Sequence, residues 1–503
     1  MKKRKITPLL LSLMLGSTVQ AAEFYSNSSG SQAIKDSYII VYNTPAALIN
    51  ADITTKAAFT ESLTTKLSAE FGLDVEYQYD NLAGVAVKAS SEQLLKLLSH
   101  PDIKFIEQNA TFSIDPQFSD FHALQNNPTW GLDRIDQRDR PLDKKYVGAN
   151  NGQGVTAYII DTGVLNSHND FGGRARNGYD FVDNDAVSQD CNGHGTHVAG
   201  TIGGSQYGVA KAVDLVGVRV LNCSGSGSYA GVIAGIDWVA GNASGPSVAN
   251  MSLGGGKSQA VNNAVANAVN RGITFVVAAG NDRGDACSKS PASEPSAITV
   301  ASSDINDARS GFSNYGKCVD VFAPGSSITS AWIGSNSATK TISGTSMASP
   351  HVAGVAALHL SKSPNLNPAQ VTTAMSNNAS KNKISDVVGS PNKLVYAKFE
   401  DQPGDGLVEI VSGNKGQSKV FPFNVASGTT KLVVSLSGGT GDADLYIKHG
   451  QEPYPIDNDC ASENPDTSNE SCVITNPANG TWYLSAYGYS AFNNVTLKAE
   501  AVK

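Results

Sequence analysis

The sequence predicts an α/β protein whose largest part is a mainly parallel β-sheet flanked by helices, between a small α+β unit and a β-sandwich. Continuous Val/Ile/Ala runs between residues 155 and 301 alternate with helical patterns, as in parallel strands buried on both faces. Short runs separated by turn residues after position 407 are typical of an antiparallel sandwich. With 40% hydrophobic and 16% charged residues, the 503-residue chain can bury a sizeable core.

Residues 1–21 have the pattern of a secretory signal peptide. Basic residues 2–5 precede the apolar run 9–15, and Val19-Gln20-Ala21 has small side chains at the spacing that a signal peptidase reads. The apolar run is far shorter than the roughly 20 residues that span a bilayer, and no later run is long enough. We therefore expect a secreted protein without a membrane span, whose cysteines can oxidise.

Residues 37–115 alternate strand and helix patterns in the order βαββαβ, which indicates a small split-βαβ unit. We expect strands over 38–42, 75–79, 82–87 and 103–106, and helices over 54–71 and after a capping box at 90–93. The Ser/Asn/Gly-rich residues 24–36 are expected to be a linker.

Residues 123–396 form the expected α/β domain. Strands are expected over 155–160, 215–220, 248–253, 274–279 and 298–301, and helices over 230–240 and 260–271. A linker at 401–405 leads into the sandwich of residues 407–503, with strand-like runs at 408–411, 419–423, 432–436, 444–447, 481–486 and 494–499.

The charge balance argues against a nucleic-acid partner. Lys and Arg total 37 and Asp and Glu total 45, a formal net charge of −8, whereas nucleic-acid binding by bulk charge needs a basic excess. The six cysteines form an even set that is too dilute for a disulfide-dense miniprotein.

Two short motifs place an acid and a histidine where ligands of parallel sheets bind. Asp161 ends the strand pattern 157–161, although a strand-ending Asp is more often a turn or cap residue. His194 and His197 lie in Asn-Gly-His-Gly-Thr-His, three positions apart and without an intervening Glu, so the zinc motif H-E-x-x-H is not met. The alternative is a polar helix start with a histidine bonded to backbone.

A third motif, Gly344-Thr345-Ser346-Met347-Ala348, places a serine near the start of an Ala/Val/Leu-rich helix that runs to about residue 360. Helix-end N–H groups and the helix dipole favour negative charge at that point. The nucleophile elbow G-x-S-x-G is not met, because its last position is Ala348 and it requires the order Ser, Asp, His.

The order Asp161, His194, Ser346, with these flanking residues, resembles the subtilisin-like serine proteases of the proteinase K and aqualysin branch over about residues 125–396. The resemblance implies that Ser346 is the nucleophile, His194 the general base and Asp161 its partner, with Asn281 in the oxyanion hole. It makes His197 structural. It also implies substrate binding by two segments, which supply Ser252, Leu253, Gly254 and Gly255, and Ala278, Ala279 and Gly280.

The small, uncharged wall 278–280 leads us to expect broad preference for apolar or aromatic residues before the scissile bond, with Lys289 near enough in sequence to modify it. Four cysteines alone allow three pairings. The resemblance implies the disulfides Cys191–Cys223 and Cys287–Cys318, and Cys460 is expected to pair locally with Cys472.

The resemblance also implies structural Ca²⁺. Asp320 matches a family ligand together with the carbonyls of Pro295 and Ala297. A second calcium loop is expected at four oxygen-bearing residues, and a third acidic stretch at 180–190 is an even choice between calcium and a solvated loop. The second loop comprises Asp133, Asp136, Gln137 and Asp143.

The flanking units resemble known modules as well. Residues 37–115 are similar to an inhibitor-type propeptide that would template folding and block the cleft until autocleavage near His122–Leu124. Residues 407–503 resemble the bacterial pre-peptidase C-terminal domain, on the motifs 438–446 and 480–483.

We therefore predict a secreted serine endopeptidase of polypeptides, made as an autoprocessed zymogen and working as a monomer. The alternatives are a non-catalytic protein of the same fold that binds proteins or surfaces through its C-terminal sandwich, and a processing protease selective for basic residues. The first would have lost a residue of the triad or oxyanion hole, and the second needs an acidic cleft.

Overall fold

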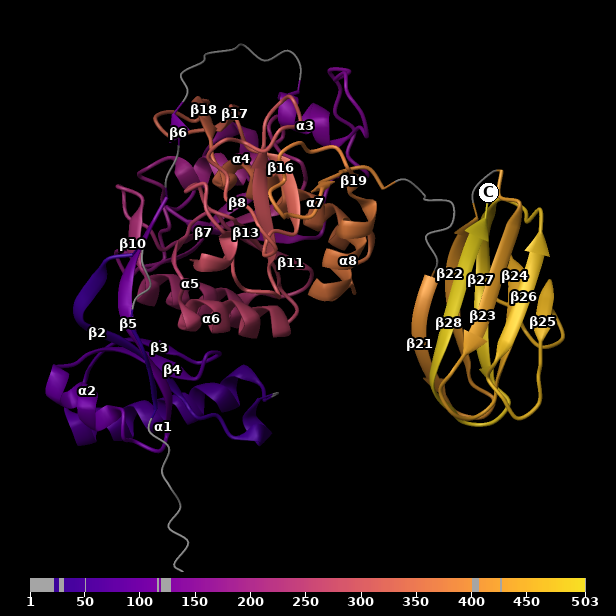
Figure 1. The fold of residues 1–503 in the computed structure, drawn as a ribbon, viewed down its shortest axis with the longest axis horizontal. Coiled ribbons are helices and arrows are strands. Elements are labelled where there is room, and N and C mark those ends of the chain that lie inside the picture. The colour runs from indigo at the N-terminus through magenta and orange to yellow at the C-terminus, as the bar shows by residue number, and fades with distance from the viewer. Residues whose placement is uncertain are drawn as a thin grey trace, which may run out of the picture. The chain divides into compact units, whose positions relative to one another are not determined.

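The computed structural model describes residues 22–26, 31–49, 51–114, 117–118, 128–399, 407–425 and 428–502. The chain divides into two compact units, residues 1–398 and 399–503 (Figure 1). The expected signal peptide and the expected cleavage region 122–124 lie outside the described residues. Of the helices that are described, none combines the length and the apolarity needed to cross a bilayer.

Within the first of these units, the elements up to residue 113 form a smaller part, called the N-terminal unit below. It has the predicted βαββαβ order: β2 (Ala33–Tyr42), α1 (Ile53–Phe71), β3 (Asp74–Tyr79), β4 (Gly84–Lys88), α2 (Ser91–Leu97) and β5 (Ile103–Ser113). Ser90 and Gln93 form the predicted capping box of α2. The linker prediction was wrong in part, because β1 (Glu23–Tyr25) pairs in parallel with β5 and β2 begins at Ala33. Both additions depend on β5, which runs seven residues beyond the predicted Ile106.

The large sheet of the first unit is mainly parallel, as predicted, with the strand order β19-β20-β16-β15-β13-β11-β7-β9-β8. Its centre consists of strands that are buried except at the first residue of β7 and of β9, and their largely apolar sequences suit burial on both faces. They are β7 (Thr156–Asp161), β11 (Ser247–Met251), β13 (Thr274–Ala278), β9 (Asp214–Arg219) and β15 (Ile298–Ser303). The outer strands are β8 (Ala175–Asp180), β16 (Val321–Pro324), β20 (Lys393–Leu394) and β19 (Ser380–Lys381).

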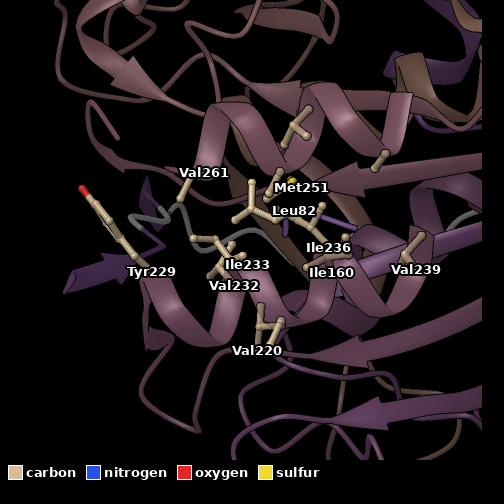
Figure 2. Close-up of a cluster of buried hydrophobic side chains, with 14 of the residues drawn as sticks. Leu82, Ile160, Val220, Tyr229, Val232, Ile233, Ile236, Val239, Met251 and Val261 are labelled. Atoms are coloured by element: carbon tan, nitrogen blue, oxygen red, sulfur yellow. The ribbon is translucent and has the colours of Figure 1, made fainter. Parts of the chain in front are cut away.

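Helices cover the sheet. Helices α4 (His194–Gly203) and α7 (Thr345–Lys362) pack against each other, and α7 contacts β11, β13 and β15. Helices α5 (Tyr229–Asn242) and α6 (Gln259–Asn270) share a separate core with the sheet. Figure 2 shows this core, in which Leu82 of the N-terminal unit lies among side chains of α5 together with Ile160 and Met251. The N-terminal unit therefore belongs to the same hydrophobic core as the α/β domain.

Two carboxylates, partly buried Asp237 and buried Glu107, join the N-terminal unit to α5 and α6. Asp237 of α5 accepts hydrogen bonds from the backbone N–H groups of Asp80, Asn81 and Leu82 at 3.0, 2.9 and 3.1 Å. In the reverse direction, Glu107 of β5, 3% exposed, accepts from the N–H of Ala260 in the first turn of α6 at 2.8 Å. The first N–H groups of a helix have no acceptor within the helix, and here the N-terminal unit supplies one for α6.

All six cysteines are paired as predicted, in the bonds Cys191–Cys223, Cys287–Cys318 and Cys460–Cys472. The C-terminal unit is the predicted sandwich of antiparallel sheets, with the orders β21-β28-β23-β26 and β22-β27-β24-β25 in its described residues. Two of these strands, β25 (Cys460–Ser462) and β26 (Glu470–Thr475), were not predicted. The others are β21 (Leu407–Gly413), β22 (Ser418–Val425), β23 (Lys431–Ser437), β24 (Ala443–His449), β27 (Gly480–Gly488) and β28 (Phe492–Val502).

Candidate active site

A buried carboxylate–imidazole pair lies at the carboxyl edge of the parallel sheet. Asp161 is the last residue of β7 and His194 the first of α4, with Oδ1 and Nδ1 2.8 Å apart and side chains 0% and 1% exposed. Because a carboxylate only accepts, Nδ1 carries the hydrogen and Nε2 presents a lone pair. The N–H of Thr162 also donates to Asp161 Oδ1 at 2.7 Å, which fixes the carboxylate in place.

The loop before α4 explains the Asn-Gly-His-Gly-Thr motif. Asp190 accepts from the N–H groups of Gly193 and Thr196, both at 2.9 Å, and so holds the helix start. A Cβ on Gly195 would lie 2.1 Å from the carbonyl oxygen of Gly163, so only glycine fits where α4 meets the turn after β7. These contacts set His194 against Asp161.

His197 is structural, as predicted. It is fully buried, and its Nε2 lies 3.0 and 3.1 Å from the carbonyl oxygens of Ile328 and Lys340. Burial lowers the pKa of His197 to about 3, so the ring is neutral and serves as a hydrogen-bond donor to backbone.

Ser346 is the second residue of α7, 4% exposed, where the helix start directs backbone N–H groups. Its hydroxyl donates to the carbonyl oxygen of Ser252 at 3.0 Å, and the Ser252 hydroxyl donates to the carbonyl oxygen of Ser346 at 2.9 Å. His194 Nε2 has no hydrogen-bond partner among the described residues. The structure therefore positions the serine through Ser252, and shows no Ser346–His194 hydrogen bond.

Asn281 follows β13 and is fixed beside Ser346. Its Oδ1 accepts from the backbone N–H of Thr345 at 2.9 Å and from the Thr345 hydroxyl at 3.0 Å. With Oδ1 committed to the residue that precedes Ser346, the amide NH₂ is the group that the side chain can direct at a ligand.

A pocket opens beside Ser346, and most of the predicted substrate-binding residues line it. They are Leu253, Gly254, Gly255, Ala278, Ala279 and Gly280, whereas Ser252 lies behind the pocket, bonded to Ser346. Gly280 has φ +100°, and a Cβ there would lie 2.4 Å from Asn314 Nδ2, so this wall requires glycine.

The strand β5 extends along this pocket. Its residues 111–113 pair antiparallel with β10 (Ser226–Ser228), Ser113 bridges Gly254, and the N–H of Ile114 donates to the carbonyl oxygen of Gly225 at 3.1 Å. Further along the chain, β6 (Gln117–Phe118) pairs with β18 (Thr339–Ser343), which ends three residues before Ser346. The cleft thus holds extended backbone on both sides of the serine.

The sequence did not reveal β10 as part of the site. Residues 224–228 read Ser-Gly-Ser-Gly-Ser, which is typical of a flexible linker. The one usable signal is glycine beside an apolar strand, because a Cβ on Gly227 would lie 2.3 Å from the carbonyl oxygen of Val220. Small residues here allow a partner strand to approach closely.

One of the three predicted acidic sites gathers its carboxylates. Asp133, Asp136 and Asp143 offer ligand atoms within 4.8 Å of one another, and Asp136 Oδ1 is buried without a partner among the described residues. Burial is the main cause that raises the pKa of both Asp133 and Asp136. Gln137 contributes to the same loop, because its Oε1 accepts from the N–H of Asp143 at 3.1 Å.

The other acidic predictions fare differently. Asp320 is joined to strand β15, where its Oδ2 accepts from the N–H of Thr299 at 2.8 Å, and burial raises its pKa to about 6. The stretch at 180–190 is not a metal cluster in the described structure, because Asp180 and Asp183 both pair with Arg219 at 2.6 Å. A cation from the neighbouring strand β9 therefore neutralises these two carboxylates, which favours the alternative of an ordinary acidic loop over calcium.

Comparison with known proteins agrees with this geometry. Residues 152–404 match the model of the subtilase family, residues 37–115 that of peptidase inhibitor I9, and residues 417–488 that of the bacterial pre-peptidase C-terminal domain. Alkaline serine exoprotease A of Vibrio alginolyticus is 48% identical over 93% of this chain and 90% of its own. An extracellular serine proteinase of Thermus sp. strain Rt41A is 49% identical over 73% of this chain and 91% of its own.

A crystal structure of a cold-adapted subtilisin-like serine proteinase superposes with a TM-score of 0.54 and 63% identity, covering 55% of this chain and all of that one. Fold, site and relatives define a serine protease with its own inhibitory propeptide. The chain belongs to the subtilase family.

The carboxylates of the propeptide interface predict pH-dependent inhibition. Burial raises the pKa of Asp237 to about 6 against the opposing effect of its three N–H donors, and burial also raises that of Glu107. A carboxyl whose pKa is higher in the complex than in the free enzyme takes up a proton when the propeptide binds. The affinity of the propeptide is therefore greatest below the pKa of the free carboxyl, and it declines as the pH rises through about 6. We expect the propeptide to inhibit the processed enzyme more strongly at about pH 5 than at about pH 8.

The measurement is the inhibition constant of the propeptide against pH, for the wild type and two variants. Asp237→Asn keeps an acceptor without the charge and should flatten the profile. Asp237→Ala leaves three N–H groups unpaired, which should weaken inhibition at least about tenfold at every pH. An inhibition constant that strengthens with rising pH would contradict the interpretation.

Proposed function

We propose that Asp161, His194 and Ser346 hydrolyse peptide bonds through an acyl-enzyme. The observation that carries the proposal is the buried Asp161–His194 pair, with the helix-start serine beside a cleft that holds extended backbone. His194 Nε2 takes the proton of Ser346 Oγ as that oxygen attacks the carbonyl carbon, and then gives it to the leaving amine. Water, activated by the same imidazole, releases the acyl group. Asp161 stabilises the imidazolium and keeps its orientation.

Asn281 and the N–H of Ser346 are the groups that would stabilise the oxyanion. Thr345 holds the Asn281 side chain by its oxygen, which leaves the NH₂ as donor toward developing charge. The start of α7 adds the N–H groups and the dipole of a long helix. Because these donors are fixed before reaction, little reorganisation is needed in the transition state.

The substrate is an extended polypeptide, and we propose internal cleavage. Support comes from the chain itself: β5 pairs with β10 and reaches the pocket that Ser346 lines, and β6, further along, pairs with β18, the strand that leads into α7. The cleft therefore binds chain that continues past the pocket. The small pocket wall of Ala278, Ala279 and Gly280 supports an apolar or aromatic side chain before the scissile bond. Binding by backbone pairing explains a broad choice of sequence.

The remaining organisation follows the zymogen pattern. We propose a signal peptide at 1–21, a propeptide at 37–115 that assists folding and blocks the cleft, and a catalytic domain at 123–396 released by cleavage near His122–Leu124. The domain at 407–503 would follow, and the protein would be secreted. The support is the propeptide strand β5 in the cleft, together with the signal pattern of the first residues.

Calcium is proposed at the loop of Asp133, Asp136, Gln137 and Asp143. Carboxylate and amide oxygens suit this hard cation. Lys398 Nζ lies 3.3 Å from Asp136 Oδ2, but Asp136 Oδ1 stays buried without a partner among the described residues, and this supports a further ligand there. Asp320 is the second proposed site, with the carbonyls of Pro295 and Ala297 as its further ligands. There the support is a largely buried carboxylate fixed by Thr299. When bound, calcium would stabilise the fold and take no part in the reaction.

A serine-reactive fluorophosphonate tests the reaction directly. We expect stoichiometric labelling of the processed protein at Ser346, located by mass spectrometry, and none in Ser346→Ala, whose kcat should fall by roughly 10⁶. A folded, processed protein that is not labelled would mean an unassembled triad, and the alternative of a non-catalytic binding protein would replace the proposal.

Replacing Asn281 with Leu should lower kcat by about 10²–10³ while KM changes little, because the oxyanion interaction forms only in the transition state. Steady-state kinetics on a peptide anilide measures both constants. Thr345→Val, which removes one donor that orients Asn281, should have a smaller effect in the same direction. Near-normal kcat in Asn281→Leu would remove this residue from the oxyanion hole.

Chelation should speed thermal inactivation. We expect EDTA to shorten the half-life of activity at elevated temperature, and added Ca²⁺ to restore it. Asp136→Asn should have a shorter half-life with calcium present and a smaller response to EDTA, whereas Asp183→Asn, in the Arg219 pair, should respond as the wild type does. A half-life that EDTA leaves unchanged would refute the calcium proposal.

A further inference from the structure

The pocket beside Ser346 carries an ion pair that an apolar specificity does not need. Among the described residues that line this pocket, only Lys289 and Asp282 are ionisable. Their Nζ and Oδ2 atoms are 2.5 Å apart. The other lining residues are glycines or have side chains that are apolar or end in a neutral hydroxyl or amide. Any charge that selects the side chain bound in this pocket therefore comes from this pair.

The backbone of Lys289 is held firmly in the pocket wall. Lys289 and Ser290 form β14, which pairs antiparallel with Gly255 and Gly256 of β12. The Cγ of Lys289 lies 4.0 Å from the point where a Cβ on Gly280 would be, so its aliphatic stem lies against the Gly280 wall of the pocket. The ammonium is thereby kept at the pocket and turned toward Asp282.

The two partners differ in their access to water. With Ser113 and Ile114 of the propeptide also lining the pocket, the side chain of Lys289 is 21% exposed and that of Asp282 is 52% exposed. A half-exposed carboxylate can be hydrated when it loses its partner, at little cost. The more enclosed ammonium keeps its need for an anion, because desolvated charges are costly when unpaired. An incoming carboxylate can therefore take the place of Asp282, whereas an incoming ammonium would meet the charge of Lys289.

We propose that Lys289 is a specificity-determining residue that lets this pocket accept a glutamate side chain before the scissile bond, in addition to apolar ones, and disfavours lysine and arginine. The inference rests on the proposed function, since it assigns this pocket to the residue on the acyl side of the cleaved bond. Asp282 acts as the resting counter-ion, which a substrate carboxylate displaces. The same arrangement opposes selection for basic residues by a processing protease.

The test compares matched peptides with the processed enzyme. Substrates are succinyl-Ala-Ala-Pro-X-p-nitroanilides with X as Glu, Gln, Phe or Lys, and the readout is the ratio of kcat/KM for Glu to that for Gln. Glu and Gln differ by charge and scarcely by size, so the ratio isolates the electrostatic contribution. We expect Lys289→Met, which keeps the stem, to lower this ratio about tenfold, and about 1 M salt to lower the wild-type ratio.

Two further variants make the test specific. Asp282→Asn frees Lys289 from its counter-ion and should raise the Glu/Gln ratio, the direction opposite to Lys289→Met. Lys317→Met removes one positive charge from an exposed site outside the pocket and should leave the ratio as it is in the wild type. Fluorophosphonate labelling of each variant confirms that its active site is assembled.

A Glu/Gln ratio that is the same in Lys289→Met and wild type, with the Phe peptide hydrolysed and Ser346 labelled, would overturn this inference alone. A higher rate on the Lys peptide than on the Gln peptide in the wild type would overturn it as well, because Asp282 would then be the selecting charge. Absence of labelling and of hydrolysis of every peptide would instead overturn the proposed function, and the inference with it.

Discussion

The buried pairing of Asp161 with His194 constrains the rest of the catalytic domain. A carboxylate that is wholly removed from water is costly unless hydrogen bonds satisfy it. Here the imidazole and the N–H of Thr162 both bond Oδ1, whereas Oδ2 is buried without a partner among the described residues. Both side chains of the pair need rigid supports: a central strand that ends at the acid and a helix that begins at the histidine. The packing of α4 against α7 then fixes the helix start that carries Ser346, so site precision derives from the core.

The sequence predicts elements whose pattern is local. The continuous apolar run of β7 and the small-residue start of α7 indicate both the element and its polar end residue, so Asp161 and Ser346 can be placed at element ends from the chain's own pattern. Their catalytic roles are implied only by the resemblance to a known family. The full length of β5 cannot, because its last residues are strand only through pairing with β10, more than a hundred positions away. The same holds for β1, which depends on β5 for its hydrogen bonds.

Acid density in the sequence does not distinguish a cation site from an ion pair. The loop at 133–143 and the stretch at 180–190 have similar spacing of aspartates. In one, the carboxylates face each other and Asp136 retains a buried oxygen without a partner among the described residues. In the other, Arg219 reaches Asp180 and Asp183 from the adjacent strand β9. The first loop also has a cation nearby, since Lys398 Nζ lies 3.3 Å from Asp136 Oδ2, but its three carboxylates still face one another. Which side chains pack beside an acidic stretch depends on the fold, and a linear pattern carries no such information.

The propeptide interface contains contacts that stabilise it and charged groups that are costly to keep there. Apolar residues such as Leu82 share the core of α5 and α6, and reciprocal carboxylates satisfy backbone donors of the opposite module. Those carboxylates are also shielded from water, and desolvation, which raises the pKa of Asp237 to about 6, makes its charged form costly there. The interface thus supplies an acceptor to the first turn of α6 at the cost of keeping charge away from water. A wholly apolar interface of the same extent would lack this cost and would hold the propeptide more tightly.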